Sequence, residues 1–375
     1  MSAPRPTAVR LLLRQARAEA GTLVALALTT FLVAGVLAAW PRAVERMVAD
    51  DLAQQVAAQS AVARDLALPA RDVVGGGPVP TPAEATALVD AHREQVEARV
   101  ADAGPALAAV LSGAEQVIAR ETFDLSKGDA APDVSEMFLT LLLDPTVAEQ
   151  VEVVEGRLPG PYDAGAVAGA APGDVTVPGR LPPVEVAVSA ATAEDLRWRV
   201  GEDRRSLDAG YPVTVRLVGT FAAVDPGAGY WSHLPSTLAA SVVDDPNNGV
   251  LVTGAAFVAP TALAALAVPT PASARSWYPL DAAAVRGQDR EALLADLLRI
   301  RAAQGLRSET ADVLVAGRAR EATVTTVLDV LAAGTAGTAL GVLWLAAVLA
   351  VERRRAAFVL LRARGASGAA VRGLA

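Results

Sequence analysis

Two long uncharged runs dominate the hydrophobic pattern, one near each end of the chain. The first, residues 21–40, reads GTLVALALTTFLVAGVLAAW and contains no charged side chain. The second, residues 322–351, is interrupted only by Asp329. Each run supplies the roughly 20 apolar residues that a helix needs to cross the hydrocarbon core of a bilayer. The pattern therefore predicts two transmembrane helices, at residues 21–40 and 322–351.

A cleavable signal peptide is the main alternative for the first run, because arginines precede it. The apolar part of a signal peptide is usually about 7–15 residues long and is followed by small residues at the cleavage site. The run here is longer and ends at Trp40–Pro41, a poor context for cleavage. A buried helix of a soluble protein is a further alternative.

Three glycines recur along the second run, at Gly334, Gly337 and Gly341. Gly337 and Gly341 have the small-xxx-small spacing that allows two membrane helices to approach closely. We expect these glycines to pack against another helix, although glycine is also simply frequent in membrane helices.

Between the two runs, the pattern changes from helical to strand-like spacing. Residues 44–56 place apolar side chains on one helix face, which predicts a stalk helix with Pro41 in its first turn. Residues 82–120 indicate further helix, broken near Gly104–Pro105. From Val151 onward, short β-type runs separated by Gly and Pro predict strands at 151–159, 183–189, 211–221 and 249–258.

Two more helices are predicted among these strands. Residues 192–201 form a short one with Thr192 as its N-cap. Residues 289–304 form an amphipathic one whose apolar side consists of Leu293, Leu294, Leu297, Leu298 and Ile300. Strands interleaved with helices predict an α+β domain over residues 41–321, flanked by the two transmembrane helices.

The distribution of charge predicts the orientation in the membrane. The whole chain has a net charge of −8, yet the first twenty residues carry four arginines and one glutamate, and residues 352–375 carry six arginines and one glutamate. Short basic flanks stay on the cytoplasmic side of a membrane. We therefore expect residues 1–20, a basic amphipathic segment, and residues 352–375 to be cytoplasmic, with residues 41–321 outside the cell membrane.

Motifs that carry chemistry are missing from the sequence. The chain has no cysteine and two histidines, His92 and His233, which are better explained as a surface residue and a satisfied loop residue. It contains no HExxH, no GxSxG and no GxxxxGK[ST] motif. The VDDPNNG segment at 243–249 lacks the glutamate that closes a calcium loop and predicts a tight polar turn. We expect no enzyme activity, no metal or cofactor in this chain, and no nucleic-acid partner.

The segment after the second run, VERRRAAFVLLRARGAS at residues 351–367, resembles the one that follows the second membrane helix in FtsX-like (MacB-type) ABC transporter permeases. The matching positions are Glu352, Arg353, Arg354, Arg355, Leu361, Arg362, Gly365, Ala366 and Ser367. Ala356 departs from the family pattern, in which an acidic residue is common there. The VVEGRLP segment at 153–159 is similar to a phrase of the family's outer core domains, which is a weaker match.

The resemblance implies a permease subunit with a MacB-like periplasmic core domain. A separate ABC ATP-binding subunit, which holds ATP and Mg²⁺, would dock on the start of the permease domain at residues 352–375. The implied docking residues are Arg362, Arg364, Gly365, Ala366, Ser367, Val371 and Leu374. Arg353, Arg354 and Arg355 would anchor the membrane exit at the lipid surface. Because the family continues with further spans, the sequence is expected to be an amino-terminal half that works with a remaining permease half or a second permease copy.

Two other functions remain open from the sequence. One is a two-span membrane sensor or envelope-binding protein whose outer domain binds a ligand. The other is a membrane-tethered enzyme. Neither the transported substrate nor the choice between export and mechanotransmission follows from these residues.

Overall fold

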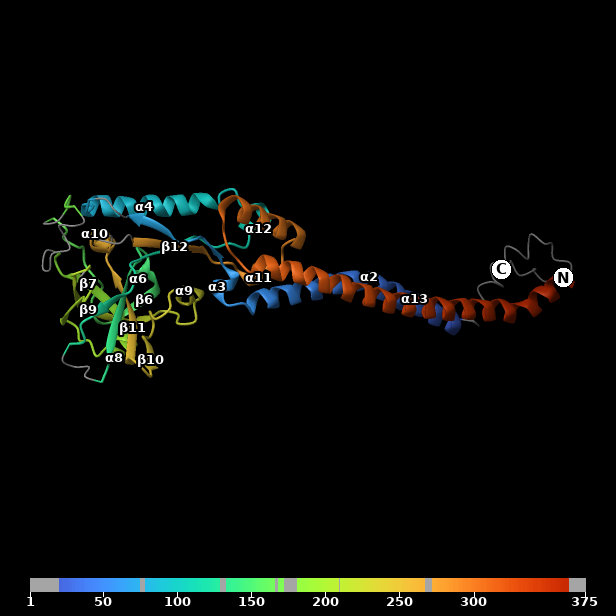
Figure 1. Ribbon diagram of the computed structural model, residues 1–375. Helices are drawn as coiled ribbons and strands as arrows, with labels where there is room; N and C mark the ends of the chain where they lie inside the picture. The colour runs from blue at the N-terminus through green and yellow to red at the C-terminus, as the bar shows by residue number, and fades with distance from the viewer. Residues whose placement is uncertain are drawn as a thin grey trace, which may run out of the picture. The chain divides into compact units, whose positions relative to one another are not determined.

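The computed structural model describes residues 20–74, 78–128, 133–165, 168–171, 181–208, 210–266 and 272–363 (Figure 1). These residues form two compact units. One spans Leu52–Val315 and is a mixed α/β domain. The other consists of the outer parts of two long helices, before and after that domain in the chain.

The two long helices are α2, Ala20–Ala57, and α13, Thr310–Ala363. Both contain the apolar runs and extend well past them. Pro41 lies inside α2, so the prediction that it occupies the first turn of a separate stalk helix was wrong. A proline in a helix interior removes one hydrogen bond of the ladder, but the helical turns on either side hold α2 together. Among the described residues, the segment Thr310–Leu349 is the one long and apolar enough to cross a membrane, judged by length and composition alone.

A single mixed sheet organises the α/β domain. Its strands are hydrogen-bonded in the order β1-β12-β3-β5-β11-β7-β9-β6. In addition, β2 pairs with β12, β4 with β5, β8 with β9, and β10 with β11. The pairs β5/β11 and β7/β9 are parallel and the others are antiparallel. The strands are β1 (Leu66–Ala67), β2 (Arg71–Val74), β3 (Glu115–Ala119), β4 (Phe123–Leu125), β5 (Glu136–Leu143), β6 (Val151–Gly156), β7 (Val184–Ser189), β8 (Asp203–Arg205), β9 (Thr214–Ala223), β10 (Ser241–Asp245), β11 (Gly249–Val258) and β12 (Ala272–Tyr278).

Helices lie between the strands in the chain, and inside the domain two of them are long, with 18 and 15 residues. The longest is α4, which runs along β2 and β12 (Figure 1). The helices of the domain are α3 (Ala61–Arg64), α4 (Pro82–Arg99), α5 (Pro105–Ala108), α6 (Val147–Gln150), α8 (Ala190–Asp195), α9 (Gly229–Ser232), the 3₁₀ turn η1 (Pro260–Ala262), α10 (Leu263–Leu266), α11 (Ala282–Val285) and α12 (Arg290–Gln304).

Most of the elements predicted after Val151 are confirmed. Strands β6, β7, β9 and β11 lie where the β-type runs predicted them, and β10 and β11 join through the expected polar turn, in which Asp245 Oδ1 accepts from the amides of Asn247 and Asn248 at 2.8 Å. The helix α12 is also confirmed. Leu298 is the exception on its apolar side, because it is 46% exposed while the other four residues are buried.

Three local predictions were wrong. The last part of the predicted helix at 82–120 is strand β3, in which Val117 and Ile118 are fully buried between neighbouring strands. Strands also begin well before Val151, with β1 at Leu66–Ala67. The N-cap of α8 is Ser189, whose side chain accepts from the Thr192 amide, and not Thr192 itself.

Gly219 lies where β9 is paired on both sides and both neighbouring ladders contain a register shift. A Cβ added at Gly219 would lie 2.2 Å from the carbonyl oxygen of Arg157 and 2.6 Å from its nitrogen. Both contacts are with backbone, which cannot rotate away as a side chain can. The close approach of β6 and β9 therefore requires glycine at this position.

We expect Gly219→Ala to lower the free energy of unfolding by about 2–3 kcal/mol, through overpacking against the Arg157 backbone. Gly113→Ala is the matched control, because nothing lies within 4 Å of its added Cβ. Urea unfolding of the purified chain, followed by tryptophan fluorescence, would measure the free energy of unfolding of both variants. Equal midpoints for the two variants would contradict this account of the β6–β9 contact.

Candidate functional site

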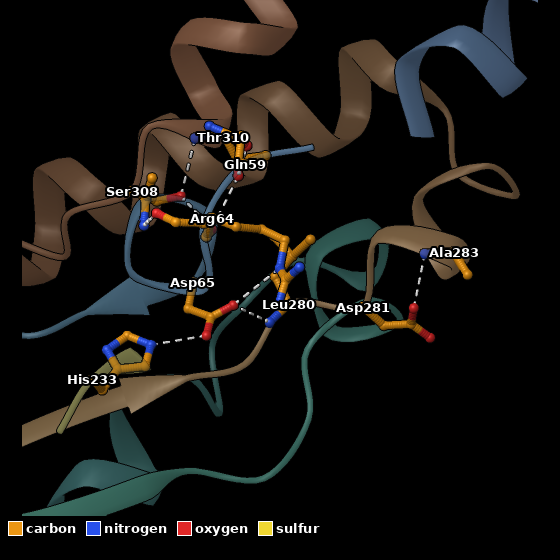
Figure 2. Close-up of polar contacts among 11 residues, drawn as sticks. Gln59, Arg64, Asp65, His233, Leu280, Asp281, Ala283, Ser308 and Thr310 are labelled. Atoms are coloured by element: carbon orange, nitrogen blue, oxygen red, sulfur yellow. Dashed lines mark hydrogen bonds and ion pairs between the residues drawn. The ribbon is translucent and has the colours of Figure 1, made fainter. Parts of the chain in front are cut away.

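A buried carboxylate, Asp65, is the centre of a polar cluster in the α/β domain. Asp65 is 1% exposed and lies directly after α3. Its Oδ1 accepts from Arg64 Nε at 3.2 Å and from the Leu280 amide at 3.1 Å, and its Oδ2 accepts from His233 Nε2 at 3.0 Å (Figure 2). One side chain thus connects α3, the loop after α9 and the segment after β12.

His233 is held on two sides. Besides its hydrogen bond to Asp65, its ring stacks on the indole of Trp277, with ring centroids 4.3 Å apart and planes 11° from parallel. Because Asp65 is an acceptor, the Nε2 of His233 carries the hydrogen and donates it. These contacts agree with the expectation of a satisfied loop histidine.

The same cluster joins the roots of both long helices. The carbonyl of Arg64 accepts from Ser308 Oγ at 2.8 Å and from Thr310 Oγ1 at 3.0 Å. Thr310 Oγ1 also lies 3.2 Å from Gln59 Oε1, just after the end of α2. Three backbone hydrogen bonds of 2.8 Å add to this, two between Ala67 and Arg307 and one from the Glu309 amide to the Ala63 carbonyl. We call this cluster the helix-root junction; it consists of Gln59, Arg64, Asp65, His233, Leu280, Ser308 and Thr310.

Apolar packing reinforces the junction. Leu52 and Val56 from the last turns of α2 belong to the same buried cluster as Ala311 and Leu314 from the first turn of α13. The buried leucines of α12 belong to the same cluster. Both helix roots are therefore embedded in one core, and the hydrogen bonds of the junction fix their register.

A second polar group also contacts the Trp277 ring. Tyr230 packs against Trp277, with centroids 5.9 Å apart, and its hydroxyl donates a short hydrogen bond to Asp144. Burial raises the pKa of Asp144. Burial, followed by the charges of Asp144 and Glu149, raises the pKa of Glu115 to about 7.

The raised pKa values in the Asp144 group are typical of a catalytic acid, but the group is closed to solvent. Asp144 is 2% exposed and Tyr230 is 6% exposed, so a substrate cannot reach the hydrogen bond between them. We therefore assign Asp144 and Tyr230 to the core. Among the residues that the structure describes, no group of three or more histidine and acidic side chains could hold a metal ion.

The site residues expected from the sequence lie elsewhere in the chain. Gly334, Gly337 and Gly341 are on α13, and within the described part of the chain nothing lies within 4 Å of a Cβ added at any of them. Their packing against another helix stays a prediction. Arg353, Arg354, Arg355 and Arg362 belong to the last turns of α13. The remaining docking residues, Arg364, Gly365, Ala366, Ser367, Val371 and Leu374, lie outside the described residues.

Sequence reasoning missed the junction for a simple reason. The partners of Asp65 are separated from it by 168 and 215 positions, at His233 and Leu280. A local signal existed only for Ser308 and Thr310, because a Ser-x-Thr segment before an apolar helical pattern is typical of a helix start.

We expect Asp65→Ala to lower the free energy of unfolding by about 3–5 kcal/mol, because it leaves Arg64, His233 and the Leu280 amide without their buried acceptor. Asp281→Ala is the control: Asp281 is exposed and caps the four-residue helix α11, so its loss should cost about 1 kcal/mol. Chemical unfolding followed by tryptophan fluorescence would compare them. A loss at Asp65 no larger than at Asp281 would show that the junction is not fixed by this carboxylate.

No protein-family model matches this chain, and no curated protein is significantly similar to it in sequence. The functional argument therefore depends on the chain's own residues and geometry.

Proposed function

We propose that this chain is the permease subunit of an FtsX-like ABC exporter or mechanotransmission complex in the cell membrane. In this proposal a separate subunit binds ATP and Mg²⁺ and hydrolyses ATP, and the chain passes the resulting movement to its α/β domain, which corresponds to a MacB-like core. The helix-root junction is the observation that carries the proposal. It joins the roots of α2 and α13 through one network, so a displacement of either root acts on the other.

The continuity of α13 supports a transmitting role. This helix begins at Thr310, inside the junction, and includes the arginines at 353–355 before it ends at Ala363. Its 54 residues correspond to about 80 Å of helical rise. A hydrogen-bonded helix changes little in length under load, so a push or pull at the arginine-rich end would reach Thr310.

Exposed apolar side chains support a membrane location. Phe31 on α2 is 74% exposed and Trp344 on α13 is 73% exposed, and further large apolar side chains are exposed along both helices. Continuous apolar surface of this kind is unfavourable in water, and lipid chains would cover it. The termini would then be cytoplasmic, and each of Arg353–Arg355 near the anionic leaflet would contribute about 1 kcal/mol to anchoring.

The proposed topology predicts a specific labelling pattern. The native chain contains no cysteine, so any thiol labelling comes from the single cysteine that is introduced. Asn247→Cys places a thiol in the exposed β10–β11 turn, and Ser2→Cys places one near the amino terminus. We expect a membrane-impermeant maleimide to label Asn247→Cys in intact cells and Ser2→Cys only after permeabilisation. The reverse pattern would rule out the proposed orientation.

The proposed docking segment predicts loss of a partner on charge reversal. We expect Arg362→Glu/Arg364→Glu to reduce at least tenfold the amount of ATP-binding protein that copurifies with the tagged full-length chain, detected by photolabelling with 8-azido-ATP. Arg199→Glu/Arg205→Glu, on exposed positions of the α/β domain, is the charge-matched control. If no photolabelled protein copurifies with the native chain, or if both double variants recover it equally, the transporter assignment fails and a two-span sensor becomes the better explanation.

A further inference from the structure

A pocket of about 210 Å³ lies between α4 and the strands β2 and β12. None of its lining residues belongs to the helix-root junction, and the pocket has no part in the proposed transmission. Its polar lining consists of Arg71, Asp72, His92, Gln95, Arg99 and Ser276. The rest of its lining is apolar and consists of Leu68, Pro69, Val73, Leu88, Ala91, Val96 and Ala274.

The pocket carries surplus positive charge. Within the described part of the chain, neither Arg71 nor Arg99 forms an ion pair or a side-chain hydrogen bond, and Asp72 is the one acidic side chain of the lining. The pKa of His92 is lowered, first by burial and then by the charges of Arg99 and Arg71. Both guanidinium groups thus act on the same small volume.

The position of these residues on α4 is specific. His92, Gln95 and Arg99 follow one another at helix-face spacing and line the pocket. Arg93 does not line it and instead pairs with Asp90 at 3.2 Å. The helix contains two arginines, and the one that faces the sheet is the one without a partner.

The walls of the pocket are held in place. The start of α4 is closed by a capping box, in which Thr81 and Glu84 exchange hydrogen bonds. Near its end, the Tyr278 hydroxyl donates to the Val96 carbonyl, which ties α4 to β12. The backbone segments that carry the charged groups of the pocket are therefore held in place without a ligand.

An unpartnered buried amide lies beside the floor of the pocket. Gln116 on β3 is 7% exposed, and neither its Nε2 nor its Oε1 has a hydrogen-bond partner in the described structure. Gln116 pairs across the strands with Ser276, so both side chains lie on the same face of the sheet. The neighbouring pair on that face, Ile118 and Ala274, packs in the same core cluster as Val89 of α4. Buried amides are normally satisfied, so the Gln116 amide can still donate to and accept from a polar group that reaches this face.

We propose that this α4 pocket binds a small organic anion, whose carboxylate or phosphate group is held by Arg71 and Arg99. Guanidinium groups match the planar oxygens of such anions and bind them with charge-assisted hydrogen bonds. Ser276, Gln95 and His92 supply further polar contacts, and Leu68, Leu88 and Ala274 accept a short apolar part. The volume is below the roughly 300–1,000 Å³ of sites for drug-sized ligands, so the ligand has only a few carbon atoms.

Binding of three small molecules to the purified full-length chain tests this proposal. The three are butyrate, its neutral isostere butyramide, and inorganic phosphate. Saturation-transfer NMR measures the binding of butyrate and butyramide, and ³¹P line broadening measures the binding of phosphate. We expect butyrate or phosphate to bind and butyramide to bind at least tenfold more weakly. Whichever of the two anions binds more tightly identifies the anionic group.

Variants assign the binding to the pocket. Arg71→Gln/Arg99→Gln should weaken anion binding at least tenfold, and Arg99→Lys, which keeps the charge, should recover part of it. Arg93→Gln is the control on the same helix and should bind as the native chain does. Circular dichroism and thermal unfolding establish that each variant is folded. The proposal is overturned if no anion binds, if butyramide binds as well as butyrate, or if Arg93→Gln weakens binding as much as the double variant.

Discussion

The burial of one negative charge constrains the centre of the α/β domain. Asp65 has almost no contact with solvent, and a buried carboxylate is tolerated only when donors surround it. Its donors come from α3, from the loop after α9 and from the segment after β12. None of these segments can move away alone without leaving charge or an amide unsatisfied. The positions of the two helix roots follow from this, because Arg64 next to Asp65 receives the hydroxyls of Ser308 and Thr310 on its carbonyl.

Strand β12 connects the junction to the rest of the domain through the alternation of its side chains. Trp277 faces the aromatic cluster, where it contacts both His233 and Tyr230. Ser276, the preceding residue, faces α4 and lines its pocket. Adjacent residues of a strand lie on opposite faces of the sheet, so one short strand borders both features. The proposed ligand site and the proposed transmission site therefore share a structural element while using different side chains.

The sequence predicted those parts of the fold that depend on local pattern. The amphipathic helix α12 lies in the expected place because the apolar positions of its buried face recur within a few turns of sequence. The strand β11 does so because a short run rich in β-type residues lies between turn residues. Strand β3 was mistaken for helix because its pattern makes sense only between β12 and β5, which come from distant parts of the chain. The same limit applies to both sites. Asp65 follows an ordinary helical segment, and Arg71 and Arg99 are separated by a whole helix, so their roles depend on tertiary contacts.

The last strand of the sheet has a consequence for the behaviour of the protein in concentrated solution. Among the described strands, β6 pairs only with β9, which leaves its other side open to a strand from another molecule. Val153 and Val154 on it are 40% and 60% exposed, a combination that favours aggregation by edge-to-edge pairing. The charges of Glu152 and Glu155 and the register shift between Val153 and Glu155 oppose that pairing, since like charges would face each other and the ladder would be interrupted. Neutralising these two glutamates would remove this protection and favour self-association through the open edge of β6.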